Sequence, residues 1–165
     1  AENYALPNGT WAYHTVNGTK SRGVEFDLQG ELADDWNIYG GVAHFNSTDA
    51  TGERLSAYLP RTTARLFTTY RLPGDWSKLT VGGGVTWQSG TYQSATNPQG
   101  ASVNVEQKSY ALASLMAKYR ATRNIDLMLT VNNLTDRRYT LMSGFYNQVV
   151  YGAPRNIVLT LNYKL

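Results

Sequence analysis

Apolar and polar residues alternate with a period of two along much of the chain. In the clearest stretch, from Val24 to Leu32, apolar side chains at 24, 26, 28 and 32 alternate with polar ones at 25, 27, 29 and 31. The same alternation returns in 61–72, in 125–132 and in 156–165. Because successive side chains of a strand point to opposite faces, each segment is predicted to be a β-strand with one apolar and one polar face.

Less regular stretches lie between these segments and complete an all-β pattern. The run from Tyr110 to Tyr119 is compatible with a short helix when taken alone, but the segments on both sides of it are strands, which favours a strand here too. Eight strands are predicted, over residues 10–17, 20–32, 36–48, 60–72, 76–91, 105–121, 124–134 and 151–165.

The connections between these strands alternate in length. Tight turns rich in Asp, Gly, Pro and Asn are predicted at 33–35, 73–75 and 121–124. Longer loops rich in Ser, Thr, Asn, Gly and Gln are predicted at 48–59, 92–104 and 135–150. This alternation is typical of an antiparallel up-and-down sheet with two unlike ends, as in outer-membrane barrels with short periplasmic turns and long extracellular loops.

Three kinds of protein share this alternation: a transmembrane β-barrel, a soluble β-sandwich and a soluble lipocalin-like ligand carrier. Several predicted strands run for 12 residues or more, where strands of globular proteins have a mode of about 5–6. The polar faces also carry many charges, among them Glu25, Asp27 and Arg65. A wet lumen accommodates such charges, whereas a small closed interior would have to pair each of them. Both features favour the transmembrane barrel.

Aromatic residues flank the apolar stretches at two levels, as in the interfacial belts of membrane barrels. The level beside the tight turns comprises Trp36, Tyr70, Trp76, Tyr119 and Tyr163, and the level toward the long loops comprises Phe45, Trp87 and Tyr139. In the last strand the residues predicted to face the membrane are Ile157, Leu159, Leu161, Tyr163 and Leu165. A soluble carrier would instead bury these side chains inside.

Composition narrows the possible functions. The chain has 165 residues, no Cys, 16% charged residues and a formal charge of +3. The absence of Cys excludes disulfides, thiolate metal sites and a Cys nucleophile, and the dilute positive charge gives no reason to expect a nucleic-acid partner. The sequence contains no Gly-x-Ser-x-Gly, His-Glu-x-x-His or phosphate-loop motif. We therefore expect neither an enzyme nor a resident metal.

Two motifs near the end of the chain resemble a known family. The segment 132–139, Asn-Asn-Leu-Thr-Asp-Arg-Arg-Tyr, resembles the Asn-Leu-x-Asp-Lys/Arg-x-Tyr signature of TonB-dependent outer-membrane receptors, and the segment 151–155, Tyr-Gly-Ala-Pro-Arg, resembles their entry to the last strand. Ser-Arg-Gly-Val-Glu at 21–25 is similar to a further family segment. The matched motif positions are Asn133, Leu134, Asp136, Arg137, Tyr139, Tyr151, Gly152, Pro154 and Arg155.

The resemblance implies a bacterial outer-membrane receptor for TonB-dependent uptake of ferric siderophores, most similar to receptors for hydroxamate or pyoverdine-type chelates. Such transporters have about 22 strands and a plugged lumen. With about eight strands, residues 1–165 are expected to be a single barrel domain without a plug domain or a TonB box. Two architectures stay open: the C-terminal third of a larger barrel, or a small closed eight-stranded barrel without transport activity.

The resemblance also implies the partners. Besides the siderophore they are outer-membrane lipid, the barrel-assembly machinery acting on the last strand, and the TonB complex, reached through parts absent from this chain. Iron would arrive as a finished chelate, so the protein needs aromatic faces, Arg charge and amide groups rather than a metal site. The candidate ligand-binding residues near the loop end are Phe45, Arg61, Gln88, Tyr92, Tyr110 and Tyr146. The motif residues Arg137, Arg138 and Arg155 are expected to form structural salt bridges or to contact lipid headgroups, and not to bind the ligand.

Overall fold

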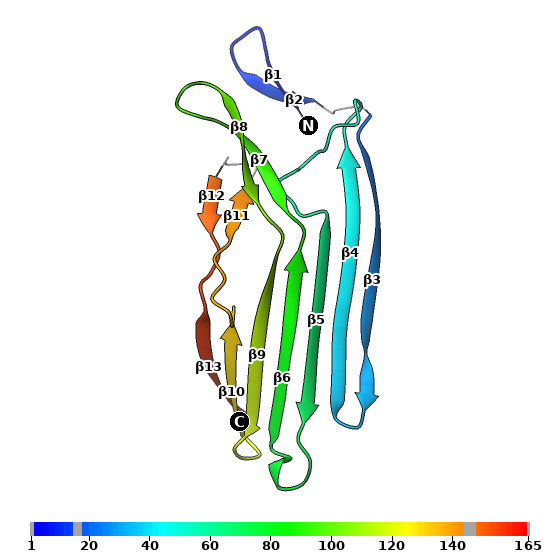
Figure 1. The fold of residues 1–165 in the computed structure, drawn as a ribbon, viewed down its shortest axis with the longest axis vertical. Helices are drawn as coiled ribbons and strands as arrows, with labels where there is room; N and C mark the ends of the chain where they lie inside the picture. Colours follow the sequence, from blue (N-terminus) through cyan, green and yellow to red (C-terminus); the bar gives the residue numbers. More distant parts are fainter. Residues whose placement is uncertain (1, 15–17, 144–147, 165) are drawn as a thin grey trace.

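The computed structural model describes residues 2–14, 18–143 and 148–164, and its main element is an antiparallel sheet of seven long strands (Figure 1). The strands lie in the order β13-β10-β9-β6-β5-β4-β3. Their bounds are β3 Lys20–Ala33, β4 Trp36–Thr48, β5 Thr62–Arg71, β6 Leu79–Gln88, β9 Tyr110–Arg120, β10 Ile125–Asn132 and β13 Asn156–Tyr163. In the described part, no helix has the length and apolar character needed to cross a membrane.

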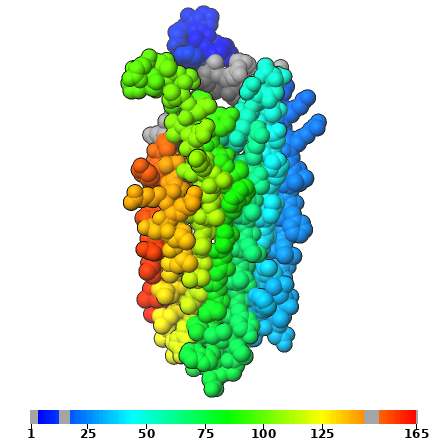
Figure 2. Space-filling view, in the orientation of Figure 1, coloured from blue at the N-terminus to red at the C-terminus, as the bar shows by residue number. Residues whose placement is uncertain are grey.

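Three two-stranded hairpins lie beyond one end of this sheet, at the end opposite the tight turns (Figure 1). They are β1 Glu2–Ala5 with β2 Trp11–His14, β7 Thr91–Thr96 with β8 Ser102–Gln107, and β11 Thr140–Ser143 with β12 Gln148–Tyr151. In the space-filling view the long strands form adjoining stripes, and the β7–β8 hairpin projects past them (Figure 2). The strands of the sheet are therefore joined by tight turns at one end and carry hairpins at the other.

The sequence predicted seven of the eight strands in the right places, including the strand over 110–119. The predicted strand over 10–17 is present as β2, but β2 pairs with β1 and does not join the seven-stranded sheet. The loops predicted over 92–104 and 135–150 contain hairpins. Strand β7 is polar on both faces, so it lacks the hydrophobic alternation that revealed the others.

The sheet is open in the described residues. Strands β3 and β13 are its two edges, and each pairs on one side alone. Of the two architectures left open by the sequence, the small closed eight-stranded barrel is therefore not formed, since the segment needed as its eighth strand lies in the β1–β2 hairpin. A barrel segment is the architecture that the structure supports.

The register of the strands places the apolar side chains on one face of the sheet and most of the polar side chains on the other. One row across the sheet joins Leu159, Leu129, Ala117, Val81, Tyr70 and Trp36. The next row joins Thr160, Met128, Lys118, Thr80 and Arg71. Since a strand alternates its faces, these rows belong to a continuous apolar face and a predominantly polar face.

The apolar face is exposed rather than packed. Leu159 is 70% exposed, and Ile157, Leu161 and Tyr163 are similarly open. Among the described hydrophobic residues, Tyr110 alone is buried. A soluble carrier would bury the residues of β13 in its interior, so this arrangement contradicts that alternative. A sheet this apolar on an open face requires an apolar environment.

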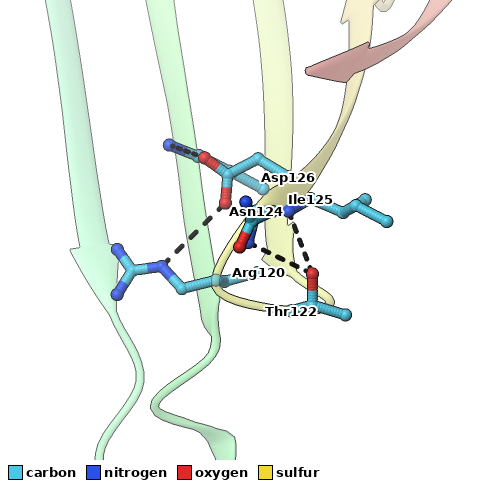
Figure 3. A network of polar contacts seen from close by, with 6 residues as sticks. Arg120, Thr122, Asn124, Ile125 and Asp126 are labelled. Carbon is cyan, nitrogen blue, oxygen red and sulfur yellow. Dashed lines mark hydrogen bonds and ion pairs between the residues drawn. The ribbon is translucent and has the colours of Figure 1, made fainter. Parts of the chain in front are cut away.

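A polar network fixes the tight turn between β9 and β10 (Figure 3). The Thr122 hydroxyl accepts hydrogen bonds from the backbone N–H groups of Asn124 and Ile125, at 3.2 and 3.1 Å. Asp126, whose side chain is 16% exposed, forms ion pairs with Lys118 at 3.2 Å and Arg120 at 3.9 Å.

The same turn is tied to the last strand. The Asn124 side-chain amide donates to the carbonyl of Lys164 at 2.7 Å, and the Lys164 N–H donates back to the Asn124 carbonyl at 2.9 Å. The turn therefore anchors the end of β13.

Glycines open space on the polar face for side chains of neighbouring strands. Gly41 of β4 lies between Asp27 and Arg65, which form an ion pair of 2.9 Å across it. A Cβ at 41 would collide with the Asp27 carboxylate. At Gly84, a Cβ would come within 2.5 Å of the Phe67 ring and 2.6 Å of the Leu66 carbonyl.

Replacing Gly84 should therefore destabilise the sheet. We expect Gly84→Ala to lower the free energy of unfolding by about 1–3 kcal/mol, because the backbone at Leu66 cannot move aside as a flexible side chain could. The measurement is the thermal unfolding midpoint of the complete receptor in detergent. Gly30→Ala is the matched control, since a Cβ at this strand position meets nothing within 4 Å. Equal midpoints for the two variants would contradict the prediction.

Candidate functional site

A hollow of about 350 Å³ lies in the polar face near the hairpin end of the sheet. Strands β3, β4, β5, β6 and β9 supply its walls, and residues from 139–141 close one side. Its polar lining includes Glu25, Asp27, Arg65, Thr86 and Gln88, and its apolar and aromatic lining includes Leu112, Leu141, Tyr110 and Tyr139. Aromatic surface beside a few polar groups is typical of a site for a bulky organic ligand.

The floor of the hollow is polar because period-two alternation directs these side chains to one face. Arg65 donates from Nη2 to Asp27 Oδ1 at 2.9 Å, and both side chains are more than half exposed. Glu25 adds a further carboxylate two residues before Asp27. A ligand in the hollow therefore meets hydrogen-bond donors and acceptors in a wet setting, where an ion pair of this kind contributes little to stability.

One wall of the hollow is aromatic and tightly packed. Tyr110 is 6% exposed and packs against Tyr139 with ring centroids 4.7 Å apart. Gly152 lies against the Tyr139 ring, and a Cβ at 152 would overlap it. The Gly152 N–H also donates to the Tyr139 carbonyl at 2.9 Å. The absence of a side chain at 152 therefore lets Tyr139 take its position against Tyr110.

The family motif forms a clasp between two segments of backbone. Asn133 is 5% exposed and has a left-handed φ of 49°, a conformation that Asn tolerates better than most residues. Its amide donates to the carbonyls of Arg137 and Ala153 at 2.9 and 3.1 Å, and its Oδ1 accepts from the Arg137 N–H at 2.9 Å. These bonds join the segment after β10 to the segment before β13.

A second set of contacts reinforces this clasp. Asp136, also left-handed with a φ of 52°, accepts the Arg155 N–H at 2.9 Å. The Leu134 N–H donates to the Ala113 carbonyl of β9 at 2.8 Å. Tyr151, in contrast, is 84% exposed. The motif thus holds the loop that carries Tyr139, which the sequence had assigned to the aromatic belt facing the membrane. That assignment is wrong, since Tyr139 packs on Tyr110 at the polar face.

Of the six candidate ligand-binding residues, five lie in the described part of the chain, and two of these line the hollow. Gln88 and Tyr110 are paired in the β6–β9 ladder and both line the hollow. Phe45 and Arg61 lie just beyond the β4–β5 ladder and are joined by a backbone hydrogen bond of 2.9 Å. Tyr92 belongs to β7, and its ring lies beneath the guanidinium group of Arg54. Tyr146 lies outside the described residues, as does the membrane-facing candidate Leu165. Phe45 continues the polar face, so its place in the membrane belt is also wrong.

Sequence reasoning missed several residues of the hollow. Thr86 lies two residues before Gln88, and Leu112 lies two residues after Tyr110, so period two alone places them on the same face. Leu141 had no such signal, because it belongs to β11, within a segment predicted to be a loop.

The hairpins above the hollow are joined to each other. Gln107 at the end of β8 accepts hydrogen bonds on Oε1 from the backbone N–H and the hydroxyl of Thr140, both at 2.8 Å. Thr91, which is buried, directs its hydroxyl toward the sulfur of Met142 at 3.8 Å. The β7–β8 and β11–β12 hairpins therefore form one connected rim.

Comparison with known proteins places the chain in a family. Residues 1–134 match the TonB-dependent receptor-like β-barrel family, and the chain belongs to it. Proteins of this kind are outer-membrane receptors of Gram-negative bacteria.

Among curated relatives, the chain is 43% identical over 94% of its length to the ferric-pyoverdine 358 receptor of Pseudomonas putida and 35% identical over 95% to the ferripyoverdine receptor of Pseudomonas aeruginosa. It covers 18% and 19% of those proteins, about a fifth of their length. A solved structure of the pyoverdine outer-membrane receptor FpvA from Pseudomonas aeruginosa, bound to pyoverdine, superposes with a TM-score of 0.86 at 34% identity. This superposition covers 99% of the chain and 24% of that structure.

The clasp gives a test of how the site is held. Asn133→Asp keeps the oxygen that accepts the Arg137 N–H but loses both donated bonds, leaving two carbonyls facing a carboxylate. We expect the free energy of unfolding to fall by about 1–3 kcal/mol, measured as the thermal midpoint of the receptor. In the control, Asn104→Asp, the side chain accepts one bond from Ser94 and keeps it. A midpoint unchanged in both variants would refute the clasp.

Proposed function

We propose that this chain forms one wall of an outer-membrane receptor that takes up ferric siderophores of the pyoverdine class. The observation that carries the proposal is the hollow in the polar face at the hairpin end, where Gln88, Tyr110 and Tyr139 meet. In a barrel the polar face lines the lumen, so a ligand entering from the hairpin side reaches this hollow. The similar receptors of Pseudomonas, which are named for ferric pyoverdines, support this choice of cargo.

The chemistry of the hollow suits a chelate. The siderophore supplies every iron ligand, so the wall has to recognise an organic surface. The rings of Tyr110 and Tyr139 offer apolar area, and Gln88 and Thr86 offer an amide and a hydroxyl. Arg65 and Asp27 supply charge at the floor. On this proposal the chain binds and guides its ligand and carries out no catalysis.

The opposite face contacts lipid on this proposal. Ile157, Leu159, Leu161 and Tyr163 of β13 are exposed on the apolar face. Trp36 and Tyr70 pack edge to face near the tight turns, with centroids 6.4 Å apart, and the Trp36 indole donates to the Thr68 hydroxyl at 2.8 Å. Such rings suit the boundary between hydrocarbon and headgroups. TonB and the barrel-assembly machinery remain the partners that the family implies, TonB acting through other parts of the receptor.

Removing the amide of Gln88 should weaken binding. We expect Gln88→Leu in the complete receptor to raise the Kd for ferric pyoverdine about 5- to 30-fold, because the chelate loses a hydrogen bond while the side-chain volume stays similar. Thr80→Val is the control, since it lies on the same face of β6 but outside the hollow. The readout is quenching of intrinsic fluorescence on titration. A wild-type receptor that does not bind the chelate would refute the proposed function.

A charge on the lipid-facing side should impair insertion. Leu159→Arg places a cation midway along β13 on the apolar face, which should cost about 2–4 kcal/mol near the bilayer midplane. Thr160→Arg lies one residue on, on the polar face, and should be tolerated. The measurement is the amount of heat-modifiable folded receptor in outer-membrane fractions. Equal losses in both variants would contradict the assignment of the faces.

A further inference from the structure

Two arginines, Arg54 and Arg61, lie in the connection between β4 and β5, at the hairpin end of the sheet. Thr48 forms an isolated bridge with Arg54, which closes the start of this connection. At its other end the Phe45 N–H donates to the Arg61 carbonyl, extending the ladder one step past the His44–Thr62 pair. Arg61 therefore continues the polar-face series of Thr63 and Arg65. The connection therefore returns Arg61 to the side of the sheet that bears the hollow.

The Arg54 side chain is held from two directions. Its Nη2 donates to the carbonyl of Leu59 at 2.7 Å, and its guanidinium carbon lies 5.5 Å from the centroid of the Tyr92 ring. The Tyr92 N–H in turn donates to the Ala57 carbonyl at 3.0 Å, which docks β7 against the connection. The charge of Arg54 is thus positioned by a backbone carbonyl and an aromatic ring.

The backbone of the connection is itself preformed. Asp49 accepts on Oδ1 from the N–H and hydroxyl of Thr51 and from the N–H of Glu53, at 2.7–2.9 Å. The Thr51 hydroxyl bond, opposed by some desolvation and helped by the backbone donors, lowers the pKa of Asp49. The Asp49 carboxylate therefore stabilises the turn through these hydrogen bonds.

The two guanidinium groups lack a counter-ion within the described part of the chain. No carboxylate lies within ion-pair distance of Arg54 or Arg61 there, and the Nε of Arg61 is buried without a hydrogen-bond partner. Partial burial, followed by the positive charge of Arg61, lowers the pKa of Arg54, while Tyr92 acts in the opposite direction. Two like charges that are partly removed from water are unfavourable unless a bound anion neutralises them.

We infer that Arg54 and Arg61, with the ring of Tyr92, form a subsite for an anionic oxygen group, and that this group is a carboxylate presented by the chelate. The inference rests on the proposed function and adds the chemical class of ligand group that the rim selects. The guanidinium fork matches a carboxylate in two-point geometry. The position of Arg61 on the polar face selects a ligand in the lumen over a phosphate of the surrounding lipopolysaccharide.

The test combines a charge change on the protein with a charge change on the ligand. The complete receptor is titrated in detergent with ferric pyoverdine bearing a free side-chain carboxylate, and with the same chelate after conversion of that group to an amide. We expect Arg61→Gln and Arg54→Gln each to raise the Kd for the free acid about tenfold or more and that for the amide less than twofold. Arg123→Gln, at an exposed tight turn, should change neither value.

The outcomes separate this inference from the proposal beneath it. A wild-type receptor that binds neither chelate refutes the proposed function, and the inference with it. A wild-type receptor that binds both, with Arg variants that weaken both equally or not at all, refutes the inference alone. Loss of co-purifying lipopolysaccharide phosphate in the Arg variants, with unchanged chelate affinity, also overturns it. Heat-modifiable migration confirms that each variant is folded before titration.

Discussion

The ladder of backbone hydrogen bonds between neighbouring strands is the interaction on which the rest of this structure depends. A single sheet with one buried hydrophobic residue in its described part has no packed core to hold it. In hydrocarbon, every N–H and C=O of a spanning strand must be paired, because no water replaces a missing partner. The open edges at β3 and β13 therefore demand further strands, which the closed barrel of the family supplies.

Register turns that ladder into two chemically different surfaces. A slip of one residue in the register would move every apolar side chain to the other face. The pairing of Leu159 with Leu129 and of Thr160 with Met128 therefore determines which face is apolar and which lines the lumen. The polar face then needs room for long charged side chains. Gly41 supplies it by letting Arg65 reach Asp27 across an intervening strand. The hollow is thus a consequence of register and of where glycine replaces a side chain.

Period two explains how much of this could be predicted from the sequence. It located the seven strands and the faces of Gln88 and Leu159, because alternation is local and survives without tertiary knowledge. It missed β7, whose residues are polar on both faces. The position of Tyr139 toward the loop end suggested the membrane belt, which is wrong. The position of Tyr139 depends on contacts with Gly152 and Tyr110, far away in the chain, which no local pattern encodes. The contact of Arg54 with the Tyr92 ring, which belongs to a different hairpin, is hidden for the same reason.

The family motif links architecture to the site without forming part of its lining, Tyr139 excepted. Asn133 and Asp136 both adopt a left-handed backbone conformation. Their side chains form hydrogen bonds with backbone groups of Arg137, Ala153 and Arg155. These bonds fix the loop that presents Tyr139 to the hollow. A motif of this kind is constrained by geometry rather than by ligand chemistry. Within this chain its role is therefore to position Tyr139, while the other side chains that line the hollow come from the strands of the sheet and from β11.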